Sequence, residues 1–156
     1  MKIIESDFGR YLEDFETGTI IKHWPGKTIT ESDNNLFSLI TMNLHPVHLD
    51  QNYAENAQHG KVLVVGTLVF SLVVGLTVRD ISGKAIANLN YTEVKHHRPV
   101  HIGDTIYAET EVVSVRPSQS KNDRGVVKVT TKALNQNMEL VLSFTREVLV
   151  QRKKVK

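Results

Sequence analysis

The chain has 156 residues and a formal net charge of +2; 40% of its residues are hydrophobic, 23% are charged, and none is cysteine. This length is typical of one domain with a sizeable core, and the composition excludes an intrinsically disordered chain. The lack of cysteine excludes disulfides, thiolate nucleophiles and cysteine-ligated metal or iron–sulfur sites.

Targeting and membrane signals are weak throughout. The first 18 residues have no basic region followed by a long apolar run, so they do not resemble a signal peptide. The longest apolar run, residues 62–78, is interrupted by glycine, serine and threonine and falls short of the roughly 20 apolar residues of a membrane span. The basic tail, residues 151–156, has no nucleic-acid-binding motif beside it. We therefore expect a cytoplasmic protein without membrane or nucleic-acid partners.

The N-terminal half is predicted to be mainly helical after an irregular lead-in over residues 1–27 and a short extended run over 27–30. Thr30 and Asp33 form a capping-box pattern that begins a helix over about 31–42. An apolar face is expected on this helix, formed by Leu36, Phe37, Leu39, Ile40 and Met42.

A proline-containing loop follows and leads to two further helices. Pro46 prevents the first helix from continuing and favours an extended backbone at His45. Asp50 is a good N-cap for a short helix that ends near His59 and Gly60. Residues 61–65 are predicted to be extended. From Thr67 to about Asp80 the chain is apolar almost all round, which is typical of a helix buried on most sides.

The C-terminal half is predicted to be a β-meander with strands over 85–97, 105–117, 126–136 and 139–152. Alternation in the second of these strands places Ile106, Ala108, Thr110 and Val112 on one face. The order of elements predicts an α+β fold, in which a curved antiparallel sheet is wrapped around one central buried helix at about 66–80.

Two motifs carry a resemblance to a known family. The segment Asn43-Leu-His-Pro-Val-His48-Leu-Asp50 and the later Arg98-Pro-Val-His-Ile-Gly-Asp104 resemble, in this order, the MaoC-like family of (R)-specific enoyl-CoA hydratases. The segment TITESDNNLFSLITMN (28–43) and the run Ala-Asn-Leu over 87–89 are similar to its mesaconyl-CoA hydratase (β-methylmalyl-CoA dehydratase) subgroup. The resemblance spans about residues 15–150 of the single domain, 1–156, and implies the hotdog fold.

The resemblance also implies an activity, reversible hydration of a 2-enoyl-CoA thioester (in reverse, dehydration of a 3-hydroxyacyl-CoA). The subgroup suggests a branched or carboxylated short acyl chain such as mesaconyl-CoA. Neither metal nor cofactor is expected. Hotdog domains of this length usually pair, so the resemblance implies a homodimer or a higher homo-oligomer. An unpaired sheet edge would in any case be a liability.

Candidate catalytic residues follow from the chemistry of this reaction. His48 matches the family's catalytic histidine, and an imidazole near neutral pH can take a proton from water. Asn43 stands where the family has an aspartate, so it can orient the water but cannot accept its proton. The first amides of the buried helix, at Val65, Gly66 and Thr67, are candidates for an oxyanion hole.

Other polar residues have a structural interpretation as well as a functional one. Asp50 is first a helix N-cap and second an orienter of its neighbours, and His45 is a loop residue that supports the site. Arg98 is expected at a solvated strand end, with contact to a CoA phosphate as the alternative. His96 and His97 face opposite sides of a strand and therefore cannot share a metal ion.

Two other functions stay open at this point. Asn43, in place of an acid, keeps open a non-catalytic acyl-CoA-binding protein. A thioesterase is less well supported, because the buried helix after Gly66 has no carboxylate before Asp80.

Overall fold

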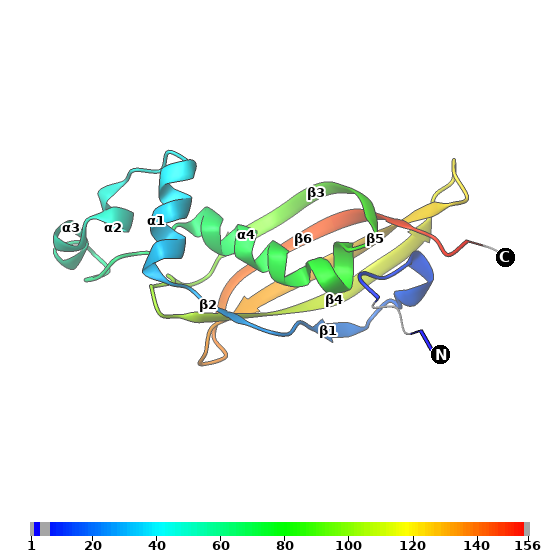
Figure 1. Ribbon diagram of the computed structural model, residues 1–156, viewed down its shortest axis with the longest axis horizontal. Coiled ribbons are helices and arrows are strands. Elements are labelled where there is room, and N and C mark those ends of the chain that lie inside the picture. Colours follow the sequence, from blue (N-terminus) through cyan, green and yellow to red (C-terminus); the bar gives the residue numbers. More distant parts are fainter. Residues whose placement is uncertain (1, 4–6, 155–156) are drawn as a thin grey trace.

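The computed structural model describes residues 2–3 and 7–154, and its main feature is a curved antiparallel sheet that lies along one helix (Figure 1). The sheet has six strands in the order β1-β4-β5-β6-β3, with β2 paired to β4. The strands are β1 (Ile20–Lys22), β2 (Lys27–Thr28), β3 (Ala85–His96), β4 (Thr105–Pro117), β5 (Arg124–Leu134) and β6 (Leu140–Gln151).

The four long strands of the predicted meander are confirmed, but the prediction that residues 1–27 are irregular is wrong. The structure places a 3-10 turn, η1 (Leu12–Asp14), and strand β1 in this segment. β1 has only three residues, too few for a visible alternation, and it exists because Ile21 pairs with Thr110 at the edge of β4. Tertiary pairing rather than local sequence therefore forms this strand.

The central buried helix is confirmed as α4 (Gly66–Thr77), which continues as a π-helical turn, η2 (Val78–Ser82). It lies along the concave face of the sheet, where Leu68, Val69 and Val73 are buried against Ala108 and Phe144. Burial of each such aliphatic side chain contributes about 1.5–3 kcal/mol, so this contact stabilises the fold substantially. Within the described part of the chain, no helix combines the length and apolar character needed to cross a bilayer.

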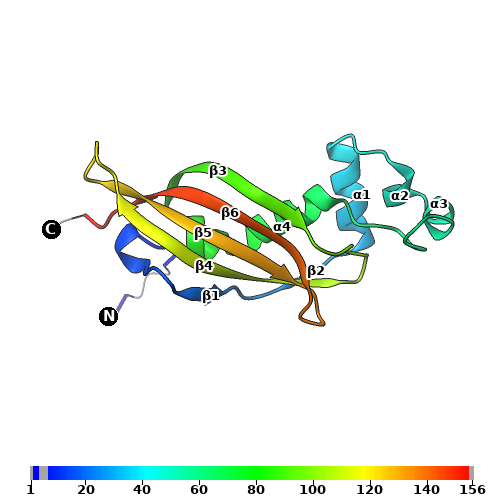
Figure 2. The ribbon, with the colours of Figure 1, turned by 180° about the vertical axis from the view of Figure 1, so that it is seen from behind.

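Three further helices gather beyond the N-terminal end of α4, at the end of the molecule opposite the two termini (Figures 1 and 2). They are α1 (Glu31–Ile40), α2 (Pro46–Leu49) and α3 (Gln51–Glu55). The Thr30 capping box is confirmed, since its hydroxyl accepts from the Asp33 amide and the Asp33 carboxylate accepts from the Thr30 amide. The third helix ends at Glu55, earlier than predicted.

Most of the apolar face predicted for α1 does not face the core. Leu36, Leu39 and Ile40 are 59–70% exposed, whereas Asn34 and Ser38, one turn apart on the opposite side, are fully buried. Only Phe37 of this face packs against the core, and the buried side of α1 is otherwise joined to the chain by the hydrogen bonds of Asn34. Among the described residues, Leu36, Leu39 and Ile40 therefore remain largely uncovered.

A buried polar layer lies under the C-terminal end of α4. His23 Nδ1 is 2.8 Å from Asp80 Oδ2, and His23 Nε2 is 2.8 Å from Thr110 Oγ1, which in turn is 2.9 Å from Thr131 Oγ1. Because a carboxylate only accepts, Nδ1 donates to Asp80, and Nε2 of the neutral ring accepts from the Thr110 hydroxyl. Burial lowers the pKa of His23, and this effect outweighs the opposing influence of Asp80.

This layer predicts that folding stability decreases in mild acid. The unfolded histidine titrates near pH 6.5, and the folded one lower, so below about 6.5 protons bind preferentially to the unfolded chain. The free energy of unfolding is therefore constant above that pH and falls below it, by at most about 1.4 kcal/mol per pH unit for one group. Urea midpoints between pH 7.5 and 5 should show this loss in the wild type and a smaller loss in His23→Gln. The exposed His97→Gln is the control, and an equal loss in wild type and His23→Gln would contradict this assignment.

Candidate active site

The histidine-containing loop is a short helix, which corrects the prediction of a loop after residue 43. Pro46 is the first residue of α2, where its missing N–H costs no hydrogen bond. His45 is the N-cap with φ −62° and ψ 128°, the extended backbone that the sequence predicted, and its Nδ1 accepts from the Val47 amide at 3.2 Å. Asp50 caps α3, as predicted, by accepting from the Tyr53 amide at 2.9 Å.

His48 is held in one orientation by the backbone. Its Nδ1 lies 2.7 Å from the carbonyl oxygen of Leu63. A carbonyl oxygen only accepts, so Nδ1 carries the proton and the lone pair of the neutral ring lies on Nε2. The half-buried ring therefore presents a proton acceptor on the side away from Leu63. The centroid of the His45 ring lies 6.1 Å from that of His48, with the two rings edge-on.

Asn34 joins the His48 segment to the start of α4. Its Nδ2 donates to the His48 carbonyl oxygen at 2.9 Å, and its Oδ1 accepts from the Val65 amide at 3.0 Å. The side chain is fully buried. Sequence analysis missed this residue, because an asparagine inside a polar stretch of α1 resembles a solvent-exposed position. The only available signal was its helical spacing from Ser38.

The hydrogen bond to Asn34 removes one of the three amides expected to form the oxyanion hole. The Val65 amide is already engaged and is therefore not free to bind a ligand. Val65 is the N-cap of α4, and no hydrogen bond from the Gly66 or Thr67 amide is found to any other part of the described chain. These two amides stand at the positive end of the helix, where anionic oxygens are stabilised.

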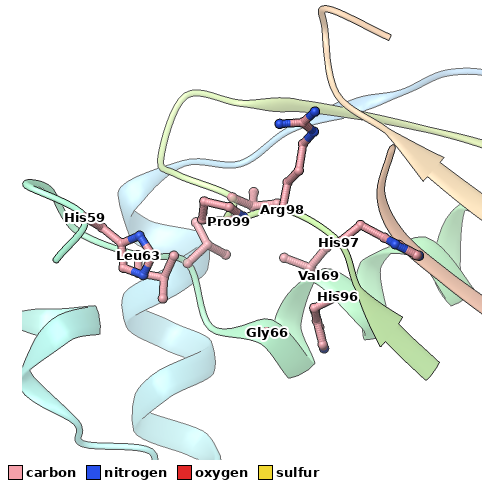
Figure 3. Close-up of a pocket in the computed structure, with 10 residues that line it drawn as sticks. His59, Leu63, Gly66, Val69, His96, His97, Arg98 and Pro99 are labelled. Atoms are coloured by element: carbon pink, nitrogen blue, oxygen red, sulfur yellow. The ribbon is translucent and has the colours of Figure 1, made fainter. Parts of the chain in front are cut away.

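A cavity of about 330 Å³ opens beside this end of α4 (Figure 3). Leu63, whose carbonyl holds His48, lies on its wall together with Gly66. The other lining residues are either basic or apolar and include no carboxylate; they are His59, Val64, Val69, His96, His97, Arg98, Pro99 and Val100. A cavity of this composition suits a ligand that combines an apolar part with negative charge.

Asn43 lies directly after α1. Met42 has a positive φ of 59°, and the Asn43 amide donates to the Ser38 carbonyl at 3.0 Å, so the helix ends in a Schellman turn. The Asn43 side chain is half-buried, and no hydrogen bond to it is found within the described residues. No hydrogen bond within the described residues therefore fixes its orientation, and its predicted role in orienting water stays a prediction.

Arg98 lies on the cavity wall with its side chain 57% exposed and 3.7 Å from Glu139. This weak surface ion pair leaves the guanidinium accessible, so both sequence-based alternatives for Arg98 stay open. His97 bonds Ser143 instead of sharing a ligand with His96. The described ranges hold no group of three or more side chains able to bind a metal ion.

Comparison with known proteins identifies the family. The family described as MaoC like domain matches residues 14–136, and the chain belongs to it. The chain is 34% identical over 150 residues to a mesaconyl-CoA hydratase of Cereibacter sphaeroides and 34% identical over 146 residues to a β-methylmalyl-CoA dehydratase of Chloroflexus aurantiacus. These matches cover 96% and 93% of this chain but only 43% and 41% of the relatives, so the chain spans less than half their length.

Solved structures give the same result for the fold. A putative MaoC domain protein dehydratase from Chloroflexus aurantiacus superposes with a TM-score of 0.92 at 32% identity, covering 97% of this chain and 43% of that one. A Mycobacterium tuberculosis protein described as a double hotdog superposes with a TM-score of 0.85 at 24% identity, covering 95% of this chain and 46% of that one. The fold is a hotdog, and its sheet is not closed into a barrel.

Asn34→Ala should lower both stability and any activity of this site. It leaves the His48 carbonyl and the Val65 amide without their protein partner, and each unsatisfied buried group costs about 1–3 kcal/mol. Asn35→Ala, one residue along α1, is the matched control and should change the free energy of unfolding by no more than about 0.5 kcal/mol. Chemical denaturation of both variants measures their free energies of unfolding. Equal values would show that the two hydrogen bonds of Asn34 contribute nothing to stability.

Proposed function

We propose that the chain is a hydro-lyase that adds water across the double bond of a 2-enoyl-CoA thioester and removes it in the reverse direction. The observation that carries this proposal is the fixed ring of His48, whose Nδ1 donates to the Leu63 carbonyl and leaves Nε2 as a base. Leu63 lies on the wall of the cavity that Gly66, the first residue of α4, also lines. Membership of the MaoC-like family and the hydratase names of the relatives support it. Because those relatives are more than twice as long, activity of this chain alone is part of the proposal.

In the proposed reaction His48 Nε2 takes a proton from water as the oxygen adds to C3 of the enoyl group. The electrons of the double bond move onto the thioester oxygen, where the Gly66 and Thr67 amides stabilise the enolate. The His48 imidazolium then returns the proton to C2, so one group carries it in both steps. Asn43 can orient the water through hydrogen bonds. Every step is an addition or a proton transfer, so the reaction needs no redox cofactor.

The acyl chain is proposed to be short and branched or carboxylated, as in mesaconyl-CoA. The names of the relatives that are 34% identical support this choice. The basic side chains around the cavity are compatible with a second negative group, although CoA itself also carries phosphates.

We also propose that the protein forms a homodimer or a higher homo-oligomer and that it is cytoplasmic. β3 is an edge strand of the sheet, and Ile86, Leu89 and Val94 along it are 41–48% exposed. Pairing of this edge with a second copy would cover both its apolar side chains and its free backbone groups. The double hotdog among the structural neighbours supports such an assembly of two domains.

A second candidate is an acyl-CoA-binding protein without catalysis, and Asn43 favours it because an amide cannot carry the proton of the reacting water. A thioesterase has less support. α4 contains no carboxylate, and the first acidic residue beyond it, Asp80, is bonded to His23 at the opposite end of the helix.

Rates of hydration of mesaconyl-CoA and crotonyl-CoA, followed at the enoyl-thioester absorbance, test the proposal. We expect turnover by the wild type and a loss of at least about 100-fold in His48→Gln, which retains the size but not the basicity of the ring. Asn43→Asp should raise the rate or leave it unchanged, because it adds a second proton acceptor. His45→Gln serves as the control histidine and should have the smaller effect.

Absence of turnover in the wild type, with turnover in Asn43→Asp, would support the binding protein and contradict the hydro-lyase. Release of free CoA without hydration would instead support the thioesterase.

A further inference from the structure

His96 lies against the first residue of α4. A Cβ atom built on Gly66 would be 3.1 Å from Cε1, 3.4 Å from Nε2 and 3.6 Å from Nδ1 of His96, so the imidazole covers the bare face of the glycine. Figure 3 shows this ring beside the N-terminal end of the helix, on the wall of the cavity that Gly66 also lines. His96 is exposed and lines the same cavity as Gly66, so we include it in the candidate site.

An irregularity in β3 precedes His96. The register with β6 shifts between Thr92 and Lys95, and Glu93 has a positive φ of 53°. A positive φ at a residue other than glycine is uncommon, and such bulges often redirect a side chain beside a functional site. After the bulge, His97 Nε2 lies 2.8 Å from Ser143 Oγ, while the His96 ring turns to Gly66.

The nitrogens of His96 are free to bind a ligand. Within the described chain no hydrogen bond to either nitrogen is found, although both lie close to Gly66. Among the described residues the Gly66 and Thr67 amides have no hydrogen-bond partner either. The Val65 amide cannot join them, because it donates to Asn34. A ligand oxygen at the end of α4 would therefore lie within reach of two amides and one imidazole.

We propose that His96 is a catalytic residue whose ring N–H donates to the thioester carbonyl oxygen, together with the Gly66 and Thr67 amides. This inference rests on the proposed function, since it requires an enoyl-CoA in the cavity. Donation to this oxygen draws charge from C3 and stabilises the enolate that forms after water adds. The proton on His96 stays on the ring throughout, while His48 carries the transferred proton.

Kinetics of His96 variants test this role. Removal of one donor to a developing oxyanion typically lowers the rate about 100- to 1000-fold. His96→Phe, which keeps a ring over Gly66 without an N–H, should lower kcat by about 100-fold and change KM much less. His96→Gln retains a donor and should recover part of this loss. Lys95→Gln removes a neighbouring exposed charge and should leave kcat within about twofold.

A spectroscopic measurement tests the contact without requiring turnover. Cinnamoyl-CoA is a chromophoric enoyl thioester whose absorbance moves to longer wavelength when donors polarise its carbonyl. We expect this red shift on binding to the wild type and to His48→Gln, and a clear reduction of it in His96→Phe. Circular dichroism of each variant establishes that it is folded.

The two proposals can fail separately. An unchanged kcat and an unchanged red shift in His96→Phe would overturn the role of His96 and leave the hydro-lyase intact. A red shift that depends on His96, in a protein without hydration activity, would support the contact and reject the hydro-lyase. A wild type that binds cinnamoyl-CoA without any shift would overturn the role of His96 directly.

Discussion

The candidate site depends on one buried amide. Asn34 donates to the His48 carbonyl and accepts from the Val65 amide, so a single side chain of α1 sets the distance between α2 and the start of α4. The Asn34 side chain is fully buried, and its bond with the Val65 amide is shielded from water. Loss of either would leave an unpaired buried group, and this cost holds the proposed base and the proposed oxyanion donors in one arrangement.

The sheet and α4 provide the rigid support for that arrangement. Apolar packing holds α4 along the concave face of the sheet. The hydrogen bonds of His23 join the sheet to Asp80, just beyond the C-terminal end of the helix. At the N-terminal end Leu68 and Val69 are buried in the core, while Gly66 lines the cavity. Gly66, without a Cβ, allows the His96 ring to approach this end closely.

Local sequence rules predicted the elements well and the contacts between them poorly. The Thr30 capping box, the Asp50 N-cap and the four long strands depend on neighbouring residues, so they could be predicted. Asn34 and His96 matter through partners 31 and 30 positions away, and simple alternation along β3 does not include a bulge. The sequence did not predict that most of the apolar side of α1 would be exposed, because a helical pattern does not say which element covers it. His48 became the candidate base only because its motif resembles that of a family.

The central claim is that this site adds water to C3 of the enoyl double bond rather than to the thioester carbonyl carbon. Incubation of crotonyl-CoA with the protein in water labelled with heavy oxygen, followed by mass spectrometry of the products, tests it most directly. The account predicts one labelled oxygen in the hydroxyl group of intact 3-hydroxybutyryl-CoA, and no such product with His48→Gln. Label in a free carboxylic acid, or no labelled product from the wild type, would contradict it.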